Sequence, residues 1–202
     1  TARGIIKATK EKVKIIGASV NLKGLHMASD TQFNRKSFTT GHTGFGIPYA
    51  TYPDRSDVPR SAARPLRYID RYVTENQGEV FFMTEALSIL EGIERGPAGN
   101  TSLAAAFSIA KEMDKDKIVV VQETEYTGAG KHHQAQLSFA KSMGIEIKFG
   151  NPVDEVPGKT IIIPGNPGLI NVQEIDLHNV KKSCIKNHLI NEPRSNLTEA
   201  DI

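Results

Sequence analysis

Apolar and polar positions along the chain alternate between helical and strand-like spacing. Short β-rich runs stand apart from segments whose apolar residues recur every three or four positions, which is the spacing of an amphipathic helix. Strands are predicted at Val13–Ile16, where Gly17 would stop the run, and at 67–74, 117–122, 145–150 and 159–165. Helices are predicted at 4–12, 83–96, 100–113 and 132–144. Short cycles of strand and helix are typical of an α/β domain.

Two of the predicted helices have recognisable ends. In 83–96, Thr84 would be the N-cap and Gly96 the residue that closes the helix. Its inward stripe would consist of Ala86, Leu87, Leu90 and Ile93. In 100–113, Asn100 or Thr101 would cap, and the buried face would consist of Leu103, Ala106, Phe107, Ala110 and Met113. Helix 132–144 would place Leu137, Ala140 and Met143 inward.

The run KIVVVQ at 117–122 has no polar residue between its ends. Continuous apolar strands are buried on both faces, as in parallel sheets covered by helices on each side. The fold class predicted is therefore α/β, a three-layer sandwich with a mainly parallel sheet. We expect one domain over 1–165 that includes a long loop at 39–65, followed by a helical tail at 166–202. Both ends resemble the interior of a domain, so we expect the chain to be a fragment.

Composition narrows the class of protein. The net charge is +2, and a dedicated nucleic-acid binder would normally carry a basic stripe. The single cysteine, Cys184, excludes an internal disulfide framework and favours a reducing compartment. The sequence has no apolar stretch long enough to cross a membrane and does not open with a signal peptide. We therefore expect a cytoplasmic protein that binds neither nucleic acid nor a membrane.

The loop after the 117–122 run is the main candidate site. Ligands of open α/β sheets bind at the carboxyl ends of strands, where a glycine-containing loop allows close approach. Glu123, Thr127, Gly128 and Gly130 occupy this position. An ordinary strand-to-helix turn would need glycine too, so that alternative stays open. The spacing matches neither a P-loop nor a dinucleotide fingerprint, because Glu125 stands where the P-loop requires its first glycine.

The histidines suggest no metal site, because none has the spacing of a ligand set. His42 lies in a loop rich in glycine and hydroxyl groups, which could close over a carboxylate substrate as a lid. The alternative is a loop that contacts a partner.

Two segments, in this order, resemble the fold-type-II pyridoxal-phosphate enzymes, which include threonine deaminases and the tryptophan synthase β chain. They are EGIERGPAGNTSLAAA at 91–106 and KIVVVQETEYTGAGK at 117–131, and KVKIIGASV at 12–20 resembles an earlier strand. The resemblance implies pyridoxal 5'-phosphate as cofactor. It implies that Thr127 meets the pyridine nitrogen, with Glu123 as rival because of the extra ETEY residues. The family's Schiff-base lysine has no counterpart here, so the catalytic residues stay unknown and the 202 residues alone are expected to be inactive.

Within the family, the long loop and VVVQETEYTGAGKHH are most similar to a coenzyme-A-dependent thiolase, an acyltransferase of ornithine degradation. This likeness implies coenzyme A and an amino-acid substrate as ligands. It also implies a small α subunit and a homo-oligomer as partners. Another fold-type-II lyase, deaminase or synthase remains an alternative, as does a non-catalytic α/β binding domain.

Overall fold

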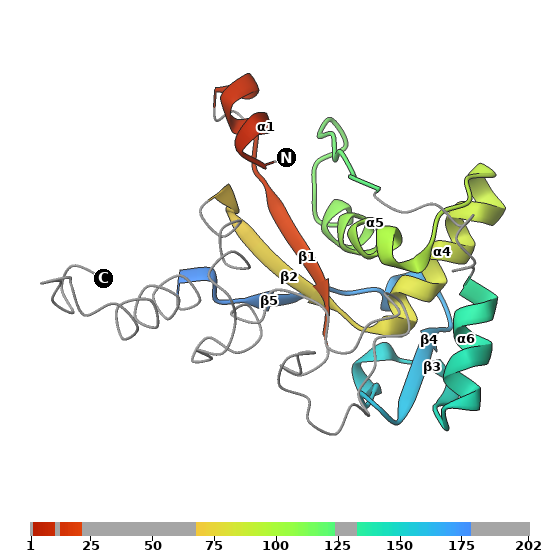
Figure 1. Cartoon of the computed structure of the whole chain (residues 1–202). Helices are drawn as coiled ribbons and strands as arrows, with labels where there is room; N and C mark the ends of the chain where they lie inside the picture. The colour runs from red at the N-terminus through yellow and green to blue at the C-terminus, as the bar shows by residue number, and fades with distance from the viewer. Residues whose placement is uncertain (1, 11–12, 22–67, 124–132, 179–202) are drawn as a thin grey trace, which may run out of the picture. The chain divides into compact units, whose positions relative to one another are not determined.

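The computed structural model describes residues 2–10, 13–21, 68–123 and 133–178 of the 202-residue chain. The described residues belong to two compact units. The first contains 2–10, 13–17, 68–72 and 174–178, and the second contains 18–21, 73–123 and 133–173. Figure 1 shows the helices and strands, which are α1 (Ala2–Thr9), β1 (Ile16–Val20), β2 (Arg71–Glu75), α4 (Gln77–Glu91), α5 (Pro97–Ala110), α6 (His133–Ser142), β3 (Glu146–Gly150), β4 (Thr160–Pro164) and β5 (Gln173–Ile175), with single 3₁₀ turns η3 (Pro152–Asp154) and η4 (Pro167–Leu169).

The described residues form both helices and strands, so the α/β class is confirmed. The described strands form two sheets. One sheet has three strands in the order β1-β2-β5, and the other pairs β3 with β4 in parallel. In the parallel pair, Ile147 lies opposite Ile161 and Phe149 opposite Ile163. The sequence Thr-Ile-Ile-Ile-Pro favours a strand because β-branched side chains suit a pleated, buried surface. Its last four residues are all buried.

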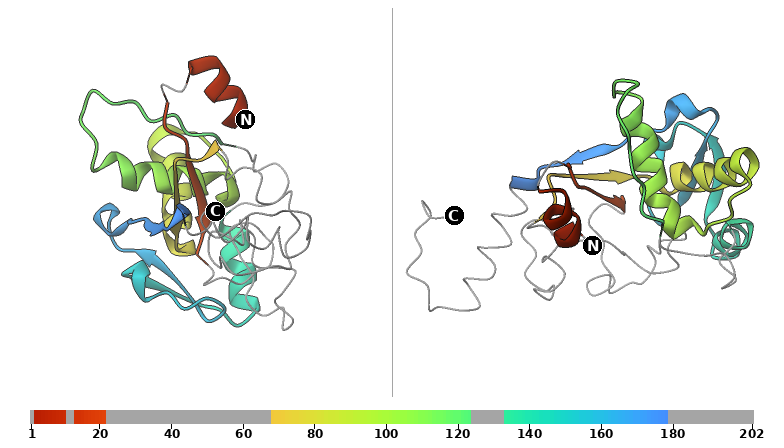
Figure 2. Two further views of the ribbon diagram at one scale, coloured as in Figure 1. Left: turned by 90° about the vertical axis from the view of Figure 1, so that its left-hand side faces the viewer. Right: turned by 90° about the horizontal axis from the view of Figure 1, so that it is seen from above.

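The second unit is organised around α4. Val80 and Met83 of α4 pack with Ala104 of α5 and Ile170, while Phe81 packs with residues of α6 and β4. In Figure 2, α6 lies beside the β3–β4 pair, which agrees with the contact of Ala140 with Ile145 and Ile161 in the second of these clusters. A helix that is buried on two opposite sides has apolar residues around most of its circumference. In α4, the four consecutive apolar residues VFFM at 80–83 fit this arrangement.

The start of α4 lies directly on β4. Glu155, just after η3, accepts hydrogen bonds from the backbone nitrogens of Gln77 at 2.9 Å, Gly78 at 3.0 Å and Ile162 at 3.0 Å. Two of these donors belong to the first turn of α4, where helical N–H groups have no intrahelical acceptor. A Cβ atom on Gly78 would overlap the carbonyl oxygen of Ile162. Glycine is therefore required where the helix meets the strand.

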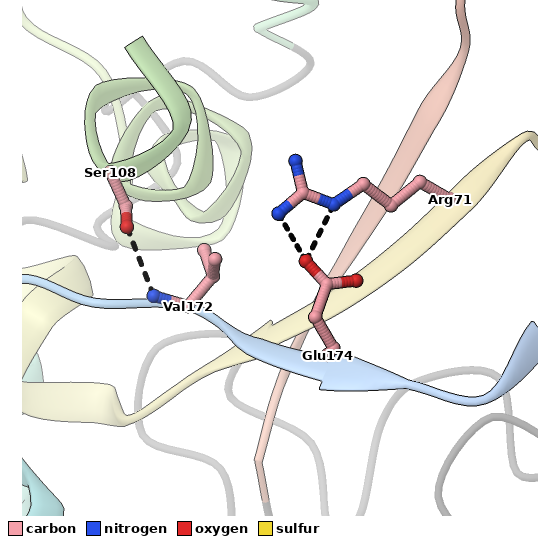
Figure 3. Close-up of polar contacts among 4 residues, drawn as sticks. All are labelled: Arg71, Ser108, Val172 and Glu174. Carbon is pink, nitrogen blue, oxygen red and sulfur yellow. Dashed lines mark hydrogen bonds and ion pairs between the residues drawn. The ribbon is translucent and has the colours of Figure 1, made fainter. Parts of the chain in front are cut away.

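The segment 166–172 is held by polar contacts from α4 and α5. Glu79 accepts from the backbone nitrogen of Asn171 at 2.7 Å, and Ser108 accepts from that of Val172 at 3.0 Å (Figure 3). Lys111, at the end of α5, donates to the carbonyl of Ile170 at 2.5 Å and lies 3.3 Å from the side-chain oxygen of Asn171.

We expect Lys111→Met to lower the free energy of unfolding by about 1–2 kcal/mol, because it leaves the Ile170 carbonyl without its donor. Urea denaturation measures this change. Lys115→Met is the control, since Lys115 is also exposed but its side chain makes no hydrogen bond within the described ranges. Equal stability of the two variants would contradict the role given to Lys111.

In the first unit, Ile69 and Tyr72 form a small core with Ile15, Ile175 and Leu177. Arg71 of β2 forms an ion pair with Glu174 of β5, and Figure 3 shows its guanidinium directed at one carboxylate oxygen. Both side chains are partly exposed, so the pair contributes little to stability.

Several sequence-based boundaries are corrected by the structure. The strand expected at 13–16 lies at Ile16–Val20 and passes through Gly17, where a Cβ atom would clash with the ring of Tyr72. Gly17 thus permits close packing and does not stop the strand. The strands expected at 67–74, 145–150 and 159–165 are confirmed as β2, β3 and β4, and the helix expected at 4–12 as α1. Within the predicted helical tail, residues 173–175 instead form β5, while the division at residue 165 stays a prediction.

The helix expected from residue 83 begins at Gln77 and ends at Glu91, and Gly92, which has a positive φ of 65°, serves as the C-cap. Thr84 is internal and donates to the carbonyl of Val80. Of the expected stripe, Leu90 and Ile93 are exposed, because α4 buries its N-terminal half. The next helix is capped by Gly96, so Asn100 and Thr101 lie inside its first turns. Ala140 of α6 is buried as expected, whereas Met143 is exposed.

The largest correction concerns residues 117–122, which form no strand and are not buried. The exposed fractions of Ile118 and Val120 are 85% and 88%. The described part of the chain places no strand beside them, so the burial that their composition predicts is absent.

Candidate functional site

The segment that ends at Glu123 runs past the start of α5. Ser102, in the second turn of α5, has its hydroxyl oxygen 2.9 Å from the carbonyl oxygen of Gln122 and 2.8 Å from that of Gly99. The single hydroxyl proton is shared between these two acceptors. This contact fixes the end of the segment against the helix, and it places Glu123 at the border of the described residues.

Glu123 has a buried carboxyl group. Neither of its carboxyl oxygens has a hydrogen-bond partner among the residues that the structure describes. Burial raises the pKa of the Glu123 carboxyl, and the positive charge of Arg95 lowers it by a smaller amount. A buried acceptor without a donor is costly, so this carboxyl group is suited to receive an N–H or O–H from another molecule or segment.

The start of α5 offers further polar groups close in sequence to Arg95. Gly96 is the N-cap, Pro97 follows it, and no side chain caps the helix. Asn100 is fully buried and donates to the carbonyls of Arg95 at 3.3 Å and Gly96 at 3.2 Å. Its side-chain oxygen has no partner within the described ranges. Of the predicted site residues, Glu123 is the one that lies within the described ranges.

The other predicted site residues lie outside the described residues. Thr127, Gly128 and Gly130 belong to 124–132, and His42 belongs to 22–67. Their roles therefore stay predictions, and so does the choice between Glu123 and Thr127. Among the residues that are described, no three His, Cys, Asp or Glu side chains gather as metal ligands do. None of the described helices is long and apolar enough to cross a bilayer.

A second group of buried carboxyls, which sequence reasoning missed, surrounds the start of α4. Burial raises the pKa of Glu75 well above its ordinary value, and the nearby charge of Glu79 raises it further. The pKa of Glu79 is raised by burial too, although its hydrogen bonds to Asn171 and Asn76 oppose the shift. Burial raises the pKa of Glu155 to about 7 against three backbone hydrogen bonds.

Two of these carboxyls, those of Glu79 and Glu155, hold segments of the fold together, whereas neither carboxyl oxygen of Glu75 has a hydrogen-bond partner among the described residues. Glu155 and Glu79 each accept backbone hydrogen bonds that join α4 to other segments. The signal that could have found this junction is the pair Asn76 and Glu79, three residues apart. That spacing is typical of a capping box, and Glu79 does accept from the backbone nitrogen of Asn76 at 2.6 Å.

Fold and site together define an α/β protein with a buried carboxyl group where an apolar segment ends beside a helix N-terminus, and this group has no hydrogen-bond partner among the described residues. Over all 202 residues the chain is 67% identical to the 2-amino-4-ketopentanoate thiolase beta subunit of Acetoanaerobium sticklandii. It is 63% identical over 202 residues to a protein of the same name from an unknown prokaryotic organism. The chain spans 43% of the length of each of these curated relatives. No family model matches the chain, and no solved structure matches it.

Proposed function

We propose that the chain is part of the β subunit of a pyridoxal-phosphate-dependent 2-amino-4-oxopentanoate thiolase. The substrate is the compound that the relatives' name calls 2-amino-4-ketopentanoate. The intact enzyme would use coenzyme A to cleave this amino acid into acetyl-CoA and alanine, a step of ornithine degradation. The observation that carries the proposal is the 67% identity over the whole chain with a relative of that name.

The described residues fit the cofactor at one point. Glu123 presents two buried oxygens that lack a donor among the residues the structure describes, and a protonated pyridine nitrogen is such a donor. When bound, pyridoxal 5'-phosphate supplies an electron sink conjugated to the α-carbon of the amino acid. A carboxylate at the ring nitrogen would hold a proton there and deepen that sink. Thr127, the rival, would accept or donate through a hydroxyl and leave the ring neutral.

The other residues of this chain would position and enclose the ligands. Ser102 fixes Gln122, and thereby the backbone that carries Glu123, against α5. Gly128 and Gly130 would let the following loop approach the cofactor closely. His42 and its loop would contact the substrate side and exclude water. The Schiff-base lysine would come from outside these 202 residues.

The name of the relatives also supports the proposal of a partner subunit. Each is called a beta subunit, so we propose that the intact enzyme pairs this subunit with an α subunit. Coenzyme A would be its acyl acceptor and the cytoplasm its location, and we expect it to form a homo-oligomer.

The cofactor proposal is tested in a chimera in which this chain replaces the matching 202 residues of the A. sticklandii beta subunit. We expect the purified chimera to bind pyridoxal phosphate and to show a visible absorbance band. Glu123→Gln is expected to shift this band or to weaken cofactor binding at least about tenfold, which is about 1.4 kcal/mol. Glu112→Gln is the matched control, because Glu112 is exposed.

The spectra of these variants show whether Glu123 or Thr127 contacts the ring nitrogen. They also distinguish a pyridoxal-phosphate enzyme from a non-catalytic binding domain. An effect of Thr127→Ala with none of Glu123→Gln would assign the ring nitrogen to Thr127. A folded chimera that stays colourless in excess cofactor would refute the pyridoxal-phosphate proposal and favour the non-catalytic binding domain.

A further inference from the structure

The outer edge of β3 has no strand beside it in the described part of the chain. On its inner edge, the backbone nitrogen of Glu146 donates to the carbonyl of Lys159 at 2.9 Å, next to the parallel pairing with β4. Successive residues of a strand direct their backbone groups to opposite sides, so those of Ile147 and Phe149 point away from β4. Such a row of N–H and C=O groups is a template for pairing with another strand.

The side chains of β3 divide into a charged face and an apolar face. Glu146 and Lys148 share the exposed face, where their charged groups lie 2.8 Å apart. Ile147 lies on the opposite face and packs against the cluster that contains Ala140. Phe149 follows on that face and is 79% exposed, so the apolar face continues beyond the part that the core covers.

The edge is complementary to itself when two copies pair in antiparallel fashion about a two-fold axis at Ile147. Ile147 then lies opposite Ile147 of the second copy, and the two residues can exchange both of their outward backbone hydrogen bonds. Glu146 lies opposite Lys148 of the second copy, and Lys148 opposite its Glu146. The exposed Phe149 lies opposite Ile145 of the second copy. Opposite charges and apolar pairs at directly opposed positions stabilise a sheet.

Other two-fold registers lack this match. An axis at Lys148 would place two lysines directly opposite each other, which is destabilising. An axis at Phe149 would place Lys148 opposite Gly150 and leave its charge without a counterpart across the strands. Lysine on an edge strand normally discourages pairing, but in the register about Ile147 each lysine meets a glutamate.

We propose that the outer edge of β3 is a homodimer interface, at which β3 pairs antiparallel with β3 of a second copy about a two-fold axis at Ile147. The two β3–β4 pairs then form one four-stranded sheet. A two-fold contact closes on itself, so this edge is used up in the dimer and does not propagate into a fibre. The inference rests on backbone direction and on charge complementarity, and it is independent of the cofactor and of the reaction.

Charge reversal tests the register in the chimera with the A. sticklandii beta subunit. Glu146→Lys places lysine opposite lysine across the axis, and Lys148→Glu places glutamate opposite glutamate. We expect each variant to raise the dissociation constant of the dimer about tenfold or more, measured by sedimentation equilibrium. Glu112→Lys and Lys115→Glu are the matched controls, because both residues are exposed and lie outside β3, and they should leave the dimer unchanged.

An equimolar mixture of the two β3 variants separates pairing between copies from the ion pair within one strand. Each variant keeps like charges within its own strand, so the intrachain pair stays broken in the mixture. Across the axis, however, the two lysines of one chain face the two glutamates of the other. We expect a heterodimer with about the affinity of the unmodified dimer. A mixture that stays monomeric, or single variants that dimerise as tightly as the unmodified chimera, would overturn the proposal.

Hydrogen exchange in the unmodified chimera tests the same edge without a substitution. We expect the amides of Ile147 and Phe149 to exchange about tenfold or more slowly when the protein is concentrated from below to above the dissociation constant of the dimer. The Glu146 amide, which already pairs with Lys159, is the internal control. Exchange of Ile147 and Phe149 that is independent of concentration would show that another part of the subunit covers the edge, or that nothing does, and would contradict the proposed occupant.

Discussion

Gly78→Ala is expected to be the most damaging single substitution in the described part of the chain, lowering the free energy of unfolding by about 3 kcal/mol or more. The added methyl group would overlap the carbonyl oxygen and carbon of Ile162 and approach the nitrogen of Ile163. These are backbone atoms of β4, which cannot rotate away as a side chain can. The first turn of α4 would have to move off the strand, and the bonds of Glu155 to both elements would lengthen.

Urea denaturation followed by far-UV circular dichroism measures the effect. Gly165→Ala is the matched control, because a Cβ atom at Gly165 meets nothing within 4 Å. The control is expected to stay within about 0.5 kcal/mol of the parent chain. A Gly78→Ala chain as stable as its control would show that α4 does not lie on β4 as described.

Glu155→Ala is expected to cost about 3–5 kcal/mol, because it removes the acceptor of three backbone N–H groups at once. These donors belong to Gln77, Gly78 and Ile162, so the loss separates α4 from β4. Glu155→Gln should cost less, about 1–3 kcal/mol, since its amide oxygen still accepts while its amide nitrogen faces a donor. Asp154→Ala, one residue away and exposed, is the control and should be nearly neutral.

The same carboxyl makes stability depend on pH. Burial raises the pKa of Glu155 from 4.5 to about 7, so the folded chain retains a proton that the unfolded chain loses between those values. The unfolding free energy therefore falls as pH rises through this window, by about 3 kcal/mol from this group. The contribution is present below pH 4.5 and absent above about 7. Glu155→Gln should flatten this part of the profile, and an unchanged slope would contradict the assignment.

Much of the strand pattern could be predicted from local sequence. The β3 and β4 strands lie within the runs expected at 145–150 and 159–165, and β2 overlaps the run expected at 67–74. β-Branched residues favour strands where their side chains are buried. The helices α5 and α6 were likewise found, with their boundaries shifted by a few residues. These elements follow from periodicity and turn residues, which are local properties.

What could not be predicted depends on long-range contacts. The segment Gln77–Phe82 did not read as a helix start, because Gln77, Gly78 and Glu79 suggest a polar loop. Their roles become clear only when β4 supplies the surface against which Gly78 packs and Glu155 supplies the acceptor. Gly17 was misread in the same way, because its packing partner Tyr72 lies 55 residues further along the chain.

The candidate site stays a prediction. The apolar run at 117–122 led to Glu123, whose buried carboxyl oxygens have no hydrogen-bond partner among the described residues. The run itself is neither a strand nor buried in the described part of the chain. The functional assignment came from the motifs at 91–106 and 117–131, which carry the resemblance, and not from composition or periodicity.

Acetyl-CoA formation by the chimera together with the A. sticklandii α subunit tests the proposed function most directly. We expect acetyl-CoA and alanine in equal amounts when 2-amino-4-oxopentanoate and coenzyme A are both present, and neither product when coenzyme A is omitted. A folded chimera with bound pyridoxal phosphate that consumes the amino acid without coenzyme A, or that forms no acetyl-CoA while the unmodified A. sticklandii subunit does, would contradict the assignment.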